Sequence, residues 1–206
     1  CISDLHGYYP KASELPAGDV LVIAGDATGR GIYSDYLSMR KYAKEWSKKY
    51  KHVIFTPGNH DLLIESNENM VRSLFEEECS NFHLLINDEI TIEGIKFWAS
   101  PITVPFMQWA FMYADHRREK VFNSIPEDTD VVVTHSPPYG ILDVVNAYRS
   151  VKHLGCMYLL DAIERIQPQA HIFGHIHESY GELETEFTTF INASSLDGNY
   201  ANVNPP

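Results

Sequence analysis

Short apolar runs rich in β-branched residues recur along the chain, and glycine, proline, asparagine or aspartate stands close behind each of them. They occupy residues 19–24, 52–56, 130–134 and 170–173. Runs of this length between turn-forming residues are typical of strands buried on both faces of a sheet. A sheet built from such strands must be covered on both sides, so the fold must be layered.

Helical patterns separate these strands. Apolar residues recur every three or four positions along residues 36–50 and 156–166, and Pro168 ends the second pattern. Residues 89–99, around the turn at Glu93-Gly94, and residues 182–192 alternate with period two, which predicts antiparallel hairpins within a mixed sheet. The chain is therefore predicted to be an α/β sandwich.

The length of 206 residues fits one domain, and we expect residues 1–206 to form it. Because the chain opens at Cys1 and reaches a polar cluster by Asp4, the numbering is expected to start inside the first strand. The three cysteines are widely spaced without a CxxC pair, which favours a reducing cytoplasm. No run approaches the ~18–20 apolar residues of a membrane span, and the first residues do not resemble a signal peptide.

The chain carries 28 acidic and 16 basic residues, a formal net charge of −12. A groove that follows nucleic-acid phosphates depends on clustered lysine and arginine, so no such groove, and no DNA nuclease, is expected. Ten histidines are the unusual feature of this acidic chain, because histidine is a common metal ligand and proton carrier at neutral pH.

A polar cluster containing aspartate, asparagine or histidine follows each predicted strand. Ligands of open α/β sheets bind beyond the carboxyl ends of the strands, so these clusters are predicted to converge on one place. The clusters are Asp4-Leu5-His6, Gly25-Asp26, Gly58-Asn59-His60-Asp61, Thr134-His135 and Gly174-His175-Ile176-His177.

These residue types supply oxygen and nitrogen ligands that suit Mn²⁺, iron and Zn²⁺, with no thiolate among them. In Asp4-x-His6 and His175-x-His177, the side chains at i and i+2 share one face of an extended segment. A lone histidine at a strand end is more often structural, but five clusters in register favour a metal site. A structural role is expected for the other histidines, which are His52, His83, His116, His153 and His171.

The order and spacing of these clusters resemble the calcineurin-like metallophosphoesterase superfamily, whose blocks are D-x-H, G-D, G-N-H-[DE], an isolated H and G-H-x-H. The resemblance implies a four-layer sandwich of two mixed β-sheets flanked by helices, with two metal ions at the strand ends. Mn²⁺ is favoured, and iron or Zn²⁺ is possible. By position, one ion would be held by Asp4, His6, Asp26 and His177, and the other by Asp26, Asn59, His135 and His175.

Finer features resemble the branch of metallophosphoesterase-domain-containing proteins and related phosphodiesterases. They are Thr134-His135-Ser136-Pro137-Pro138, the run GHIHESYG at residues 174–181, Ile191-Asn192-Ala193-Ser194 and Asn204-Pro205-Pro206. Protein Ser/Thr phosphatases instead extend their second block to G-D-x-V-D-R-G. Gly29 stands where those enzymes keep an aspartate that orients their catalytic histidine, and Arg30 matches their phosphate-binding arginine in register. Arg30 is therefore either a substrate-binding residue or a plain turn residue.

The resemblance also implies a mechanism. Two ions can acidify a water that bridges them, which makes hydroxide available as nucleophile, and can clamp the phosphoryl oxygens. Asn59, His60 and Arg30 would contact the substrate, and His60 would protonate the departing alkoxide. Asp61 would hold His60 in place, or else would cap the helix that follows.

The substrate class follows less directly. The segment of residues 101–113 carries four aromatic rings that either stack on a nucleobase or close the core. We expect a phosphodiesterase acting on small diesters such as 2′,3′- or 3′,5′-cyclic nucleotides. The alternatives are a phosphomonoesterase or protein phosphatase, and a metal-binding scaffold with vestigial activity. Two ions facing two of the acidic residues would make the pocket locally positive, which admits a small phosphoester.

Overall fold

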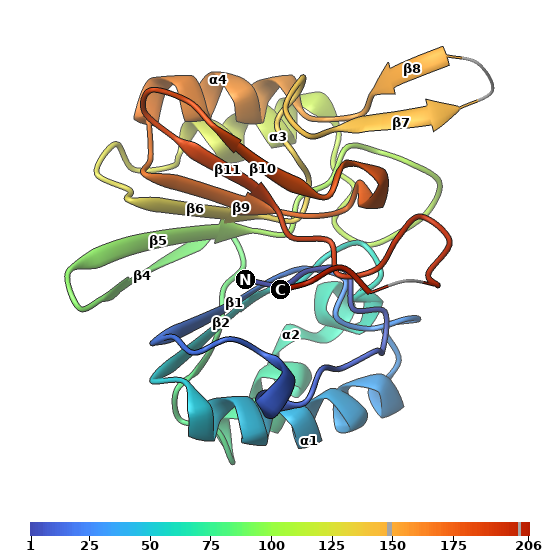
Figure 1. The fold of residues 1–206 in the computed structure, drawn as a ribbon, viewed down its shortest axis with the longest axis vertical. Coiled ribbons are helices and arrows are strands. Elements are labelled where there is room, and N and C mark those ends of the chain that lie inside the picture. Colours follow the sequence, from blue (N-terminus) through green and yellow to red (C-terminus); the bar gives the residue numbers. More distant parts are fainter. Residues whose placement is uncertain (148–149, 202) are drawn as a thin grey trace.

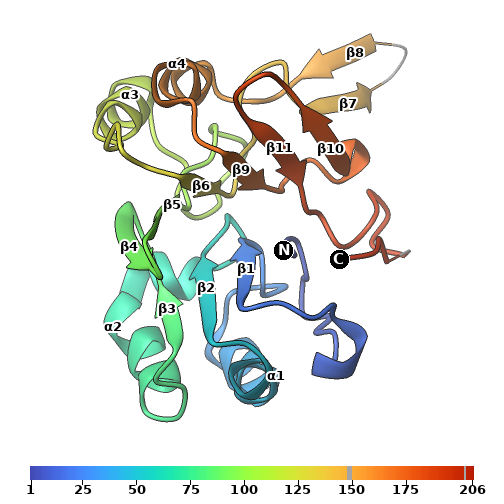
Figure 2. The same ribbon diagram turned by 60° about the vertical axis from the view of Figure 1, so that its left-hand side comes forward.

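The computed structural model describes residues 1–147, 150–201 and 203–206. Two β-sheets face each other, and a pair of helices covers the outer face of each sheet (Figures 1 and 2). The smaller sheet has the order β1-β2-β3, and both of its pairings are parallel. Its strands are β1 (Val20–Ala24), β2 (His52–Thr56) and β3 (Phe82–Leu84), and its helices are α1 (Tyr33–Lys49) and α2 (Leu62–Glu76).

The larger sheet has the order β10-β11-β9-β6-β5-β4 and carries an antiparallel hairpin at each edge. Its strands are β4 (Asp88–Ile92), β5 (Ile95–Ser100), β6 (Val131–Thr134), β9 (Ala170–Phe173), β10 (Gly181–Glu184) and β11 (Thr189–Asn192). Helices α3 (Asp115–Asn123) and α4 (Met157–Ile166) cover it. The remaining elements are η1 (Ala12–Glu14), the hairpin of β7 (Val144–Ala147) and β8 (Ser150–His153), and η2 (His177–Ser179).

The predicted α/β sandwich is thus confirmed, with a smaller sheet that is parallel rather than mixed. Each of the four predicted buried strands is present within one residue of its predicted start, and both predicted hairpins form. The sequence pattern did not predict β3, α3, β7, β8, η1 or η2, and α2 was expected only as the helix that follows Asp61, without bounds.

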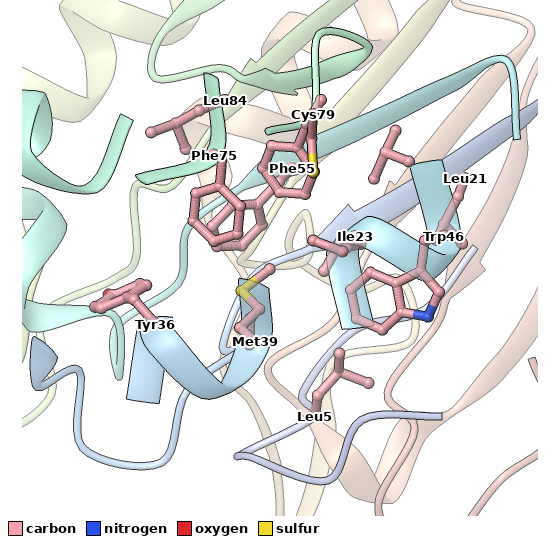
Figure 3. Close-up of a cluster of buried hydrophobic side chains, with 14 of the residues drawn as sticks. Leu5, Leu21, Ile23, Tyr36, Met39, Trp46, Phe55, Phe75, Cys79 and Leu84 are labelled. Carbon is pink, nitrogen blue, oxygen red and sulfur yellow. The ribbon is translucent and has the colours of Figure 1, made fainter. Parts of the chain in front are cut away.

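Strand residues alternate between two apolar layers, which explains the continuous apolar runs. Along β1, Leu21 and Ile23 pack against α1 and α2 (Figure 3), whereas Val22 and Ala24 face the larger sheet. A third layer, which includes Phe122, lies between the larger sheet and helices α3 and α4. Among the described residues, no helix combines the length and the apolar character needed to cross a membrane.

The first residues of the chain lie between the two sheets. The Ile2 N–H donates to the carbonyl of Val22 at 2.9 Å, and the Ser3 N–H donates to the carbonyl of Ala193 at 2.9 Å. Isolated parallel bridges accompany these bonds, one to β1 and one to the residues that follow β11. This segment therefore connects the end of one sheet to the end of the other, directly before Asp4.

Candidate active site

Asp4, His6 and His177 form the first group of side chains at the strand ends. The Nε2 atoms of His6 and His177 lie 3.3 Å apart, and Asp4 Oδ1 lies 4.0 Å from the first and 3.3 Å from the second. Asp4 is fully buried, and the two rings are partly buried. One carboxylate oxygen and two imidazole nitrogens thus face a common point, although Asp4 and His177 are 173 positions apart.

Asp26, Asn59, His135 and His175 form the second group. His135 Nε2 lies 2.9 Å from Asn59 Oδ1 and 3.3 Å from Asp26 Oδ2. The rings of His135 and His175 meet edge to face, with centroids 5.0 Å apart. Ligand atoms of Asp26, His135 and His175 lie within 4.8 Å of one another.

Asp26 belongs to both groups. Its Oδ2 lies 3.8 Å from His6 Nε2 and 3.3 Å from His135 Nε2, whereas its Oδ1 accepts the backbone N–H of His60 at 2.7 Å. Oδ2 of Asp26 therefore stands between the two groups. The structure brings together all seven residues expected to bind metal.

The backbone of the site is unusual. Four of the seven residues have a left-handed φ, between 44° and 71°, which non-glycine residues rarely adopt. They are Asp4, His6, Asp26 and His175. Gly25 has a φ of 97°, and a Cβ on Gly174 would lie 2.1 Å from Asp4 Oδ2, so both glycines allow the close approach of the strand ends.

Asp4 provides the test of whether the residues fit a metal ion. Its Oδ2 accepts hydrogen bonds from Ser194 Oγ and from the His175 N–H, each at 2.9 Å. Its Oδ1 is buried and accepts no well-aligned hydrogen bond from the described residues, and its nearest charged neighbour is His177 Nε2 at 3.3 Å. A buried carboxylate oxygen without a donor carries a large desolvation penalty. A cation between Asp4, His6 and His177 would remove that penalty, so the site fits a metal ion.

The charges in the site agree with this interpretation. Burial lowers the pKa of both His6 and His175 to about 4, so these rings are neutral, as metal ligands must be. Burial alone would also lower the pKa of His135, but the negative charge of Asp26 raises it to about 9. Asp4 has the same effect on His177 and raises its pKa to about 9. Protonated His135 and His177 thus supply positive charge at the positions of the expected cations, and a metal ion that binds there would displace these two protons.

The imidazole of His60 lies beside both groups, and together with His6 and Asp26 it also brings ligand atoms within 4.8 Å. Its Nδ1 lies 2.9 Å from the carbonyl oxygen of Gly29, to which it can donate. The expectation that Asp61 holds this ring is therefore wrong. The orienting group is a backbone carbonyl at Gly29, the position at which the resemblance places an aspartate in protein phosphatases.

Asp61 links the two loops that carry Asp26 and Asn59. Its buried carboxylate accepts the N–H groups of Gly58, Ala27 and Thr28 and the hydroxyl of Thr28, at 2.8–3.3 Å. Asp61 also stands at the N-cap position of α2, but its side chain makes no capping bond. Burial raises its pKa to about 6, and the nearby charge of Asp26 adds to this effect. Neither of its two expected roles agrees with these contacts.

Arg30 does not belong to the site. Its side chain is exposed, it does not line the pocket above the two groups, and its backbone N–H donates to Asp35 Oδ2 at 3.1 Å. The structure therefore favours the turn residue over the substrate-binding residue.

A pocket of about 300 Å³ opens above the two groups. Its lining is Asp26, Asn59, His60, Phe106, Met107, Trp109, His175, His177, Glu178, Gly198 and Tyr200. The sequence interpretation missed Glu178, Gly198 and Tyr200. The ring of Tyr200 contacts His6 and His177, with centroids 4.7 and 5.1 Å away. Adjacency to His177 is the one sequence signal that points to Glu178.

The remaining histidines lie outside the metal-capable groups found among residues 1–147, 150–201 and 203–206. His171 is fully buried in the larger sheet, and His116 is exposed. His52 and His83 pair with each other, with Nδ1 and Nε2 3.1 Å apart. His153 Nδ1 lies 2.6 Å from Asp143 Oδ1.

Two Asp/His groups that share a carboxylate, at the strand ends of a four-layer α/β sandwich, define the class of metal-dependent phosphoesterases. The chain belongs to the calcineurin-like phosphoesterase family, whose sequence model matches residues 1–179.

Named relatives agree with this assignment. The chain is 35% identical over 230 residues to human Metallophosphoesterase domain-containing protein 1, with all of this chain and 68% of the relative covered. It is 35% identical over 219 residues to a UPF0046 protein of Caenorhabditis elegans, with all of this chain and 72% of the relative covered. Phosphopantetheinyl Hydrolase of Mycobacterium tuberculosis superposes on 97% of this chain and 89% of its own, with a TM-score of 0.62 and 15% identity, which shows the fold alone.

Proposed function

We propose that this chain is a phosphodiesterase that uses two metal ions. One ion would be held by Asp4, His6, Asp26 and His177, and the other by Asp26, Asn59, His135 and His175. The observation that carries the proposal is Asp4 Oδ1, which is buried, accepts no well-aligned hydrogen bond from the described residues and faces two imidazole nitrogens. The donor set of oxygen and nitrogen without sulfur suits Mn²⁺, iron and Zn²⁺ alike, and Mn²⁺ is the ion proposed for the first tests.

The ions, when bound, supply an acidified water and positive charge for the phosphoryl oxygens. The residues of the chain then divide the remaining work. Asn59 and His60 line the pocket and would contact the phosphoester. Because Nδ1 of His60 is engaged by Gly29, Nε2 is the ring nitrogen that can give a proton to the leaving oxygen.

The pocket wall supports a diester substrate. Among the described residues that line the pocket there is no lysine or arginine, whereas Glu178 contributes a carboxylate. The Glu178 carboxylate repels a doubly charged monoester more than a singly charged diester. The volume of about 300 Å³ suits a small ester, so cyclic nucleotides are the first substrates to test. The three free cysteines support a reducing, cytoplasmic location for the reaction.

The test is an activity panel after metal removal and reconstitution with Mn²⁺. It compares cyclic nucleotides, bis(p-nitrophenyl) phosphate, p-nitrophenyl phosphate and a phosphopeptide. We expect the diesters to be hydrolysed fastest, and Asp26→Asn to lose Mn²⁺ binding in calorimetry together with activity. A clear preference for the phosphopeptide would favour a phosphatase. Tight Mn²⁺ binding without turnover of any substrate would favour the vestigial scaffold.

A further inference from the structure

The aromatic segment of residues 101–113 is attached to the candidate active site through its backbone. The Ala110 N–H donates to the carbonyl of Asn59 at 3.1 Å, and the Phe111 N–H donates to Glu65 Oε1 on α2 at 2.9 Å. Ala110 and Phe111 are buried, whereas Phe106 and Met107 at the tip are 61% and 76% exposed. The base of the segment is therefore held against the loop that carries His60.

Trp109 lies next to this anchored base and stacks on His60. The two ring centroids are 4.2 Å apart and the planes differ by 24°. His6 meets the same imidazole edge to face at 4.6 Å, and Gly29 engages its Nδ1. Tilting the imidazole out of its plane is blocked by the indole, and turning it over would break the bond to Gly29. The contacts thus leave Nε2 as the free position of the ring.

The identity of the orienting group makes this packing important. A neutral carbonyl holds an imidazole less strongly than a carboxylate does, because charge-assisted hydrogen bonds are about twice as strong. Gly29 offers only the carbonyl. A second constraint on the ring is therefore needed, and Trp109 supplies one from a segment 49 positions further along the chain.

We infer that Trp109 is a positioning residue that aligns His60 with the leaving oxygen of the substrate. The inference rests on the proposed function, in which His60 donates the proton. It does not require Trp109 to touch the substrate. Because a displacement of about 1 Å can reduce the rate ~100-fold, the indole matters most when departure of the leaving group needs a proton.

The experiment compares Trp109→Leu, Trp109→Phe and His60→Ala in the Mn²⁺-loaded protein. A cyclic nucleotide has an alkoxide leaving group, which needs a proton to depart. The leaving group of bis(p-nitrophenyl) phosphate is p-nitrophenolate, which departs without one. For Trp109→Leu we expect kcat on the cyclic nucleotide to fall ~10–100-fold. We expect KM to stay within about threefold, and kcat on the p-nitrophenyl diester to stay within about threefold. Trp109→Phe keeps a stacking ring and should recover most of the loss.

The matched control is Phe187→Leu, which removes an exposed aromatic ring from the turn between β10 and β11 and should leave both substrates unaffected. A double mutant adds a second readout. If the indole acts through His60, Trp109→Leu in the His60→Ala background causes no further loss on the cyclic nucleotide.

Several results would overturn the inference. Equal losses of Trp109→Leu on both substrates would show a general structural role, and full activity on the cyclic nucleotide would show no role. Additive losses in the double mutant would separate Trp109 from His60. A failure of the proposed function can be told apart from a failure of this inference. In that case the parent protein shows no turnover, or His60→Ala is as active as the parent on the cyclic nucleotide.

Discussion

The buried histidine of the larger sheet should make stability depend on pH. His171 is fully buried on β9 and contacts the rings of Phe173 and Phe190. Thr134 Oγ1 donates to the carbonyl of Ser136, so at the 2.8 Å contact with His171 it accepts from Nε2. Nδ1 then carries no proton, and it has no partner among the described residues. Protonation would place a buried charge on a nitrogen without an acceptor.

Burial accordingly lowers the pKa of His171 from 6.5 to about 3. With a pKa depressed by folding, the stability contribution is complete above pH 6.5 and is lost as the pH falls, because the unfolded chain binds a proton that the folded chain does not. Each pH unit below 6.5 lowers the free energy of unfolding by about 1.4 kcal/mol. At pH 5 the expected loss from this residue is therefore about 2 kcal/mol.

His171→Phe isolates the contribution of this histidine, because phenylalanine keeps an aromatic ring beside Phe173 and Phe190 and cannot be protonated. Urea unfolding of both proteins would be followed by circular dichroism at pH 8, 6.5, 5.5 and 5 in chelator. The free energy of unfolding of the variant, relative to the parent, should rise by about 2 kcal/mol from pH 8 to pH 5. Other titrating groups cancel in this difference. Parallel curves for the two proteins would refute the reasoning.

Three further substitutions test the site. Gly174→Ala places a methyl group 2.1 Å from Asp4 Oδ2 and should weaken Mn²⁺ binding tenfold or more, as measured by calorimetry. The control is Gly18→Ala, whose methyl group meets one atom at 3.8 Å, and equal Mn²⁺ affinities of the two variants would contradict the geometry. The Asp61 carboxylate accepts four hydrogen bonds, and Asp61→Asn leaves some of their buried donors unpaired, so it should lower the free energy of unfolding by about 2–4 kcal/mol. An unchanged melting temperature would show that Asp61 does not link the two loops. Glu178→Gln removes a charge from the pocket wall and should raise kcat/KM for p-nitrophenyl phosphate ~3–10-fold relative to bis(p-nitrophenyl) phosphate. An equal change on both substrates would show that Glu178 does not select substrates by their charge.

The ligand set could be predicted because it depends on strand ends. Parallel strands such as β1 and β2 end at the same edge of a sheet, so residues just beyond them must meet, whatever lies between. The strands could be recognised because burial on both faces keeps them apolar throughout. Helix α2, for which the sequence showed no apolar pattern, is the opposite case. Only four of its 15 residues are buried, and Asn67 interrupts it with a non-helical backbone.

The residues around His60 could not be predicted for a different reason. Asp61 is adjacent in sequence, but its carboxylate bonds to backbone N–H groups of two loops instead of the neighbouring ring. The group that does hold the ring is a main-chain carbonyl, and no side chain signals it. Trp109 and Tyr200 reach the site because their loops follow particular paths, which depend on the packing of the whole molecule.

The segment at Ile2 and Ser3 has a consequence for folding kinetics. It bonds to Val22 at one end of the chain and to Ala193 at the other, so Asp4 takes its position only after both sheets exist. Contacts over such a sequence separation form late, and a half-folded intermediate would present no complete ligand set. Ion capture would then mark the last step of folding, and a captured ion would act as a cross-link between the two halves. Chelators should accordingly speed global unfolding, whereas excess Mn²⁺ should slow unfolding more than it speeds refolding.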